Sequence, residues 1–414
     1  MHGVWQRRVT NAVALVIAAL SGGLGDARAT DGAALVEGSC TGCHQLNQIE
    51  NSAGYTADGW RELIGTMIDL EGTAELDSIT AYLAEHYPPN ARRVPVVVEG
   101  PVSLTFTEWV APTLGERSRD PVEAPDGAIW WAGMWADKAN RVDPATGEIT
   151  VYDLPPGTRP HTVTADAEGR IWFTGNGNGT LGRLDPETGD ITVWEMPDAD
   201  TEDPHSAIVD EAGLVWFTLQ RSNMVGRLDP VTGALVIVTM PTADSRPYGI
   251  KLDADGTPWV AANGSNRLYR IDAYSMDVTE FPVSDEGTTI RRLAFASDGG
   301  IWYVNSGLGR IGRLDPETGD FKEWDSPSGP ASHPYAIAVI DDIVWYNESR
   351  QRPDMLVRFD PATETFQSWA IPSGTIHAGI VRHMRPTRSG DLLIHQSSTN
   401  RVILVQASDA PVTD

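Results

Sequence analysis

The stretch Gly182-Arg183-Leu184-Asp185-Pro186 decides the fold of most of the chain, because its pattern of Arg, an apolar residue, Asp and Pro recurs. Copies begin at Arg141, Arg183, Arg227, Arg270, Arg313, Arg358 and Arg401, the copies at 270 and 401 being incomplete. Successive arginines are 42, 44, 43, 43, 45 and 43 residues apart. Four short antiparallel strands and their turns need about 40 to 50 residues, so the period predicts β-propeller blades.

A second recurring pattern, an Ile-Trp-Phe strand such as Ile171-Trp172-Phe173, precedes each copy of the arginine signature. Seven strands of this type can be counted, and we expect their tryptophans to pack between neighbouring blades. Asp185-Pro186 followed by Gly189 suits a type I turn with a left-handed exit.

The last repeat unit stops after residues 401–405, without an outer strand. Residues 104–109 have the outer-strand pattern and precede the first full unit. We therefore predict an all-β seven-bladed propeller over residues 104–405, closed by the N-terminal strand so that no edge stays unpaired, with a tail at 406–414.

The motif Cys40-Thr41-Gly42-Cys43-His44 predicts covalent attachment of one haem c, with both thiols bonded to the vinyl groups and His44 as the proximal iron ligand. These are the only two cysteines in 414 residues. A zinc half-site would need a second pair of ligands, and a thioredoxin-like pair needs no following histidine.

Three short helices are predicted around the haem: residues 31–39, a helix from Thr56 that includes Met67, and residues 74–86. We expect Met67 to be the sixth iron ligand, where a thioether raises the reduction potential. His86 is a weaker candidate near the end of the last helix. The Gly59-Trp60 pair and Met67 resemble the cytochrome c domains of quinohaemoprotein-type dehydrogenases, so a small all-α cytochrome c domain is expected over residues 30–90, before a linker at 91–103.

The first 29 residues read as a secretory signal, with Arg7 and Arg8, an apolar run and an Ala27-Arg28-Ala29 cleavage site. A periplasmic protein whose mature chain does not span the membrane is therefore expected. The net charge of −26 excludes a basic stripe for nucleic acid and suits steering toward a periplasmic redox partner.

Polar residues gather at the predicted mouth of the propeller, in the loops that lead into the innermost strands and follow the second strands. Convergent polar and aromatic groups in a concave mouth favour a small-molecule site. His161 and His205 are general acid/base candidates, Arg292 could clamp a carboxylate or oxyanion, and Glu348 could act as a base or metal ligand.

The repeat resembles the streptogramin (virginiamycin B) lyase family, on the Gly-Arg-Leu-Asp-Pro signature, the Ile-Trp-Phe-Thr strands and starts such as Arg159-Pro160-His161. The resemblance implies a seven-bladed propeller that opens a cyclic ester by elimination at a Mg²⁺-assisted His/Glu site. Of the carboxylates expected after the Trp strand only Glu348 fits, while Asn176 and Gln220 stand beside the histidines, which weakens a metal-assisted lyase. Mg²⁺ remains a candidate ion at the mouth.

Three functions follow from these expectations. In the first, an exported c-type haem protein transfers electrons while the propeller binds a substrate or redox partner. In the second, a streptogramin-lyase-like C–O lyase carries an accessory cytochrome domain. In the third, the propeller is a non-catalytic docking platform for the cytochrome. The fused haem motif favours the first, because a lyase needs no electron carrier.

Overall fold

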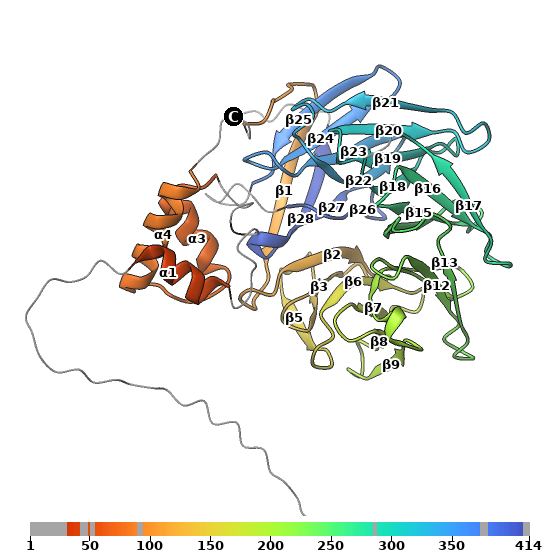
Figure 1. Ribbon diagram of the computed structural model, residues 1–414, viewed down its shortest axis with the longest axis horizontal. Helices are drawn as coiled ribbons and strands as arrows, with labels where there is room; N and C mark the ends of the chain where they lie inside the picture. The colour runs from red at the N-terminus through yellow and green to blue at the C-terminus, as the bar shows by residue number, and fades with distance from the viewer. Residues whose placement is uncertain are drawn as a thin grey trace, which may run out of the picture.

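The structure, a computed structural model, describes residues 31–41, 49, 54–88, 94–284, 288–372 and 380–408. A small helical module lies beside a much larger ring of β-sheets (Figure 1). The predicted signal segment and three residues of the haem motif, Gly42, Cys43 and His44, lie outside the described residues. Within the described ranges no helix is long and apolar enough to cross a membrane.

Four helical segments make up the described part of the module, and side-chain caps explain where three of them begin. Asp31 caps α1, Thr56 caps α3 and Thr73 caps α4 by accepting a backbone N–H of the first turn. One apolar side of each helix packs into a shared cluster that contains Val36, Trp60, Leu63, Ile79 and Leu83. The segments are α1 (Gly32–Leu35), η1 (Val36–Cys40), α3 (Ala57–Gly65) and α4 (Ala74–His86).

Helix α3 is shorter than predicted, because it ends at Gly65 and leaves Met67 in the following turn. The Thr66 hydroxyl donates to the Leu63 carbonyl at 2.7 Å, which closes the last turn. The Thr66 carbonyl accepts hydrogen bonds from the propeller, so it is not available to continue the helix. Met67 therefore lies two residues beyond the end of the helix, and its predicted helical position is wrong.

Seven four-stranded antiparallel sheets follow, which confirms the predicted number of blades. In each sheet the strand given first below is the innermost, and the seven innermost strands surround the central channel. The strands are β2 (Ser118–Glu123), β3 (Ile129–Gly133), β4 (Lys138–Val142), β5 (Ile149–Asp153); β6 (Pro160–Ala165), β7 (Ile171–Gly175), β8 (Thr180–Leu184), β9 (Ile191–Glu195); β10 (Pro204–Val209), β11 (Val215–Leu219), β12 (Met224–Leu228), β13 (Leu235–Thr239); β14 (Pro247–Leu252), β15 (Pro258–Ala262), β16 (Arg267–Ile271), β17 (Val278–Pro282); β18 (Ile290–Phe295), β19 (Ile301–Asn305), β20 (Arg310–Leu314), β21 (Phe321–Asp325); β22 (Pro334–Ile340), β23 (Ile343–Glu348), β24 (Met355–Asp360), β25 (Thr365–Ala370); and β26 (Met384–Pro386), β27 (Leu392–Gln396), β28 (Arg401–Ser408), β1 (Ser103–Val110).

The second blade shows how the repeated residues hold a sheet together. The Trp172 indole is buried between blades and donates its N–H to Asp166 at 3.0 Å, and Arg183 lies over its ring at 5.5 Å. A Cβ on Gly182 would collide with the ring of Phe173, so only glycine fits there. The turn after Arg183 ends at Gly189 with φ of 78°, which confirms the predicted left-handed exit.

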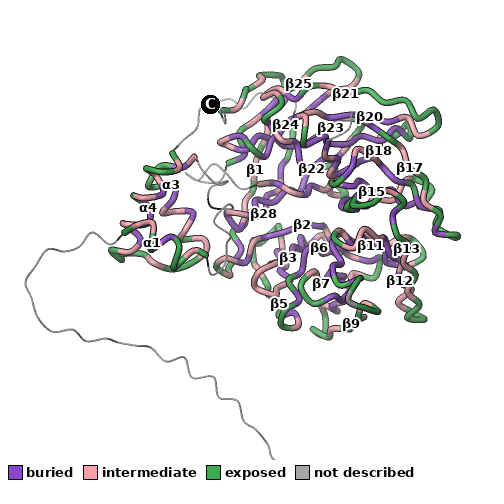
Figure 2. Tube along the Cα trace, viewed as in Figure 1, coloured by how far each residue is buried: buried purple, intermediate pink, exposed green. Residues whose placement is uncertain are grey.

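The N-terminal strand closes the ring as predicted. Strand β1 pairs antiparallel with β28 from Ser103 opposite Ser408 to Val110 opposite Arg401, and so supplies the outer strand of the last blade. In Figure 2 the sheets are largely buried, while exposed residues gather on the outer turns. Because the ring of blades is closed, its innermost strands form the wall of one central channel. The polar side chains of the candidate site lie on this wall.

Candidate functional site

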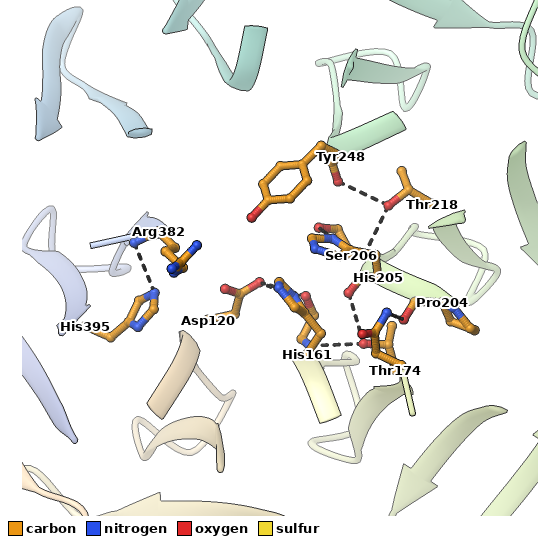
Figure 3. Close-up of polar contacts among 12 residues, drawn as sticks. Asp120, His161, Thr174, Pro204, His205, Ser206, Thr218, Tyr248, Arg382 and His395 are labelled. Atoms are coloured by element: carbon orange, nitrogen blue, oxygen red, sulfur yellow. Dashed lines mark hydrogen bonds and ion pairs between the residues drawn. The ribbon is translucent and has the colours of Figure 1, made fainter. Parts of the chain in front are cut away.

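Three ring side chains from consecutive blades stack at the wall of the channel. The centroids of the His161 ring on β6 and the His205 ring on β10 are 3.6 Å apart, and those of His205 and Tyr248 on β14 are 4.3 Å apart. Each of the three residues is at most 4% exposed. Figure 3 shows His161, Tyr248, Arg382 and Asp120 pointing toward the middle of the ring. The structure thus brings together two of the predicted site residues, His161 and His205.

Asp120 on β2 is the carboxylate that lies next to these histidines. It is fully buried, and its φ of 38° is an unusual backbone conformation for a residue other than glycine. Its Oδ2 accepts a hydrogen bond from the Thr162 hydroxyl at 2.7 Å and lies 3.6 Å from Nη2 of Arg292 and 3.9 Å from Nδ1 of His161. Asp120 therefore links the histidines to Arg292, the third predicted site residue.

Two tyrosines face each other across the channel. The Tyr248 and Tyr335 hydroxyls are 2.6 Å apart, and Nη1 of Arg382 donates to the Tyr335 oxygen at 3.1 Å. Burial raises the pKa of Tyr335, but the guanidinium groups of Arg382 and Arg291 and the bond to Tyr248 outweigh it and lower the pKa to about 7. Burial and the neighbouring Tyr335 raise the pKa of Tyr248 to about 12. Near neutral pH, Tyr248 thus donates while Tyr335 accepts.

Burial keeps the histidines of the channel neutral. It lowers the pKa of His161 and of His205 well below the usual value, and nearby positive charges, including Arg119 and Arg292, act in the same direction. Neutral imidazole can accept a proton, so His161 and His205 suit a general base rather than a general acid.

The fourth predicted site residue, Glu348, lies apart from this cluster. It is fully buried at the end of β23, where its carboxylate accepts hydrogen bonds from the Ser326 hydroxyl at 2.7 Å and the Ser328 N–H at 2.9 Å. The Ser328 hydroxyl donates to its second oxygen. These partners lie in the loop after β21, so Glu348 joins two blades and is not placed beside the histidines.

The residues of the channel do not fit a Mg²⁺ ion. In the part of the chain that the structure describes, no three His, Cys, Asp or Glu side chains are grouped so that they could hold a metal. Mg²⁺ requires near-octahedral oxygen ligands, whereas Asp120 is surrounded by a guanidinium group, an imidazole and a hydroxyl. Guanidinium groups stand where a divalent cation would need anions.

The helical module contacts the loop that leads into the channel. The Thr66 carbonyl accepts hydrogen bonds from the N–H of Gly115 and from Nδ2 of Asn400, both at 2.8 Å. The Asn400 Oδ1 accepts from the N–H of Arg117 at 2.9 Å. Gly115 precedes β2 by only a few residues, so the turn that contains Met67 is joined to the strand that carries Asp120.

Two channel residues, Arg119 and Asp120, are missing from the sequence-based candidates, because β2 does not begin with the Pro-His or Pro-Tyr pattern. Their distance in sequence from the start of the following Trp strand identifies them as channel residues. His161 lies ten residues before Ile171, the start of a Trp strand, and Arg119 lies ten residues before Ile129.

Comparisons with known proteins agree on the propeller. Residues 97–353 match the model of the virginiamycin B lyase family. Among solved structures, a streptogramin B lyase is 22% identical with a TM-score of 0.66, over 74% of this chain and 98% of that chain. A virginiamycin B lyase from Staphylococcus aureus has the same identity and score over 73% and 99%. A catalytically inactive His-to-Ala variant of the latter enzyme with quinupristin is 21% identical, with a TM-score of 0.65 over 73% and 99%. A search of curated proteins finds no match.

Proposed function

Because the chain belongs to the virginiamycin B lyase family, we propose that it is an exported, periplasmic member of that family that carries one covalent haem c. In this proposal the propeller channel binds a small molecule, and the helical module exchanges electrons with a periplasmic redox partner. The proposal combines a shared propeller with a haem motif that a lyase alone would not need.

The described part of the helical module fits a haem. The side chains of Cys40 and Met67 pack against the same apolar cluster. The Cys40 sulfur, which would bond to a haem vinyl carbon, and the Met67 sulfur, which would bind the iron, could therefore reach the same haem. The Trp60 indole is 3% exposed, and its N–H has no hydrogen-bond partner within the described ranges, as if an acceptor such as a haem propionate completed it. Haem, held by Cys40, Cys43, His44 and Met67, would supply one-electron transfer.

The observation that supports the proposal most directly is the contact of Thr66 with Gly115 and Asn400. It holds the turn of Met67 against the loop that leads into β2. These two hydrogen bonds, one from a backbone N–H and one from a side-chain amide, place the turn of Met67 beside the loop that leads into the channel. A redox group in this module would therefore stand beside whatever the channel binds.

A Met67→Leu substitution tests the haem assignment, because leucine keeps the volume and removes the sulfur. The full chain is produced with a working cytochrome maturation system, and its oxidised visible spectrum is recorded. We expect loss of the weak absorption of a Met–iron bond at the red end of the spectrum, with the haem still attached. Met196→Leu, a propeller variant, is the matched control; an unchanged band in the Met67 variant would disprove the ligand.

The family match and the neutral histidines favour a second function, elimination on a cyclic ester. A neutral imidazole of His161 or His205 could remove a proton beside a carbonyl, and Arg292 could stabilise the developing oxyanion. Quinupristin, present in the structure of the related variant, is the substrate to assay, with ring opening followed by mass spectrometry. Ring opening that disappears in His161→Asn and His205→Asn would establish the lyase; an intact antibiotic excludes it for this substrate.

A further inference from the structure

The channel carries a charge opposite to that of the whole protein. The chain has a net charge of −26. The channel wall nevertheless holds four guanidinium groups that interact with Tyr248 or Tyr335. They belong to Arg119, Arg291, Arg292 and Arg382. Among the described residues, Asp120 is the carboxylate that approaches them. A buried excess of positive charge is costly unless an anion compensates it.

Several of these guanidinium groups have donors without partners. Nε and Nη1 of Arg119 and Nε of Arg382 are buried and donate no hydrogen bond to any described residue, and Nη2 of Arg292 makes only the 3.6 Å ion-pair contact with Asp120. Arg119 and Arg292 are each 4% exposed. Unsatisfied buried donors are rare in folded proteins, and each costs about 1–3 kcal/mol unless a ligand or water accepts from it. The donors therefore point to an acceptor that belongs in the channel.

These donors share one space. Arg292 lies 4.7 Å from the centroid of the Tyr248 ring, and Arg382 lies 5.3 Å from that of Tyr335. The two tyrosines are joined through their hydroxyls at 2.6 Å, so the two arginines stand on either side of one pair. Arg119 interacts electrostatically with both tyrosines and with Arg382. Figure 3 shows Arg382 and Tyr248 directed into the middle of the ring.

We propose that the propeller channel binds a small carboxylate, or the carboxylate end of a larger molecule, between Arg119, Arg292 and Arg382. The proposal rests on the small-molecule function above and names the chemical class of its ligand. A planar guanidinium fork matches a carboxylate through parallel N–H···O bonds. The unpaired donors named above belong to such groups, which also bind phosphate, so inorganic phosphate is included in the test.

Calorimetric titration of the haem-loaded full chain with acetate tests the proposal, in a carboxylate-free buffer at constant ionic strength. Acetamide, the neutral molecule of the same shape, serves as the parallel ligand. We expect one acetate per chain and no binding of acetamide. Arg119→Gln and Arg382→Gln should each weaken acetate binding about tenfold or more, the loss of charge-assisted hydrogen bonds.

Arg313→Gln is the matched control, because Arg313 forms an exposed pair with Asp298 on the outside of its blade. It should bind acetate as the unchanged chain does. Circular dichroism and thermal midpoints identify any variant that fails to fold; if both channel variants fail, an acetate-dependent, acetamide-independent rise in the melting temperature of the unchanged chain replaces them. No acetate binding, equal binding of acetamide, a preference for inorganic phosphate, or folded channel variants that bind normally would each overturn the proposal. None of these results depends on the haem, whose attachment is scored separately by its spectrum.

Discussion

At the scale of single residues, the channel depends on the balance between four arginines, of which Arg119 and Arg292 are buried and Arg291 and Arg382 are half-buried, and the few groups that can be negative beside them. Asp120 is one such group, and Tyr335 is another, because its pKa of about 7 lets it change charge near neutral pH. A residue that changes charge inside an arginine cluster competes with any anion that the cluster binds. The first prediction below follows from this competition, and the second concerns the stability that Asp120 provides.

The first prediction concerns pH. Below pH 7 Tyr335 is neutral and the arginines are free for a ligand anion; above it the phenolate adds a negative charge among Arg119, Arg291 and Arg382 and beside Tyr248. Acetate affinity should therefore fall as pH rises, by about tenfold from pH 6 to pH 8 if only the neutral form binds. Titration calorimetry at both pH values checks this.

The Tyr335→Phe variant is the control. It should bind acetate equally at pH 6 and pH 8, since burial keeps nearby His161, His205 and His333 neutral throughout. A pH dependence that survives in this variant would contradict the assignment to Tyr335.

The second prediction concerns Asp120. Asp120→Asn leaves the positive charge of Arg292 without its buried partner, which should lower the free energy of unfolding by about 3 kcal/mol. Chemical denaturation measures the change. Asp298→Asn, which breaks an exposed pair with Arg313, should cost less than 1 kcal/mol. Equal losses in the two variants would show that Asp120 has no special role.

The sequence predicted the position of a channel side chain where that side chain stands in a repeated place, while its role stays a prediction. His161, His205 and Arg292 were found because the starts of the inner strands can be aligned by the repeat. Glu348 has the expected place along its strand, but Ser326 and Ser328 of the loop after β21 bind its carboxylate. The sequence pattern of one blade does not show which residues will donate hydrogen bonds to a buried carboxylate, because those donors come from packing between blades.

At the scale of elements, the blade is explained by residues that recur at one position in each strand. The Trp strand, the arginine above its ring and the glycine beneath the next aromatic ring were all visible as a pattern. The helix ends were less predictable, since α3 stops at Gly65 because of hydrogen bonds to Gly115 and Asn400, far along the chain. Contacts between distant segments leave no local signal.

The third prediction tests the packing within one blade. Gly182→Ala places a methyl group against the Phe173 ring and should lower the free energy of unfolding by about 1–3 kcal/mol. Denaturant titration gives the value. In a Phe173→Leu background the same change should cost clearly less, because the planar ring that it meets is gone. An identical cost in both backgrounds would mean that the collision is not the cause.

At the scale of the whole molecule, one joint between the helical module and the ring is the turn that contains Thr66. Asn400, with φ of 52°, binds the Thr66 carbonyl with its Nδ2 and the Arg117 N–H with its Oδ1. It thereby connects the module to the loop that leads into the channel. The propeller and its closing strand were predicted from the sequence, but the joint between the helical module and the propeller depends on three-dimensional contacts that the sequence does not display.

The fourth prediction tests this joint. Asn400→Gly removes both side-chain hydrogen bonds and keeps a residue that tolerates positive φ, so residues 57–67 and 112–117 should exchange amide hydrogens faster. Hydrogen–deuterium exchange with mass spectrometry measures the rates. Asn223→Gly is the control, because Asn223 also has positive φ, in the corresponding loop of another blade, and binds only within the propeller. Similar exchange in the two variants would contradict a joint at Asn400.

We propose that an exported haem-bearing module is joined to the mouth of the propeller channel. The intact mass of the full chain, purified under denaturing conditions after expression with a cytochrome maturation system, tests it most directly. We expect a coloured chain, shortened at its N-terminus by signal cleavage after Ala29 and heavier than the remaining sequence by one haem. Cys40→Ser/Cys43→Ser should give a colourless chain. A colourless, unmodified chain from the unchanged sequence would contradict it.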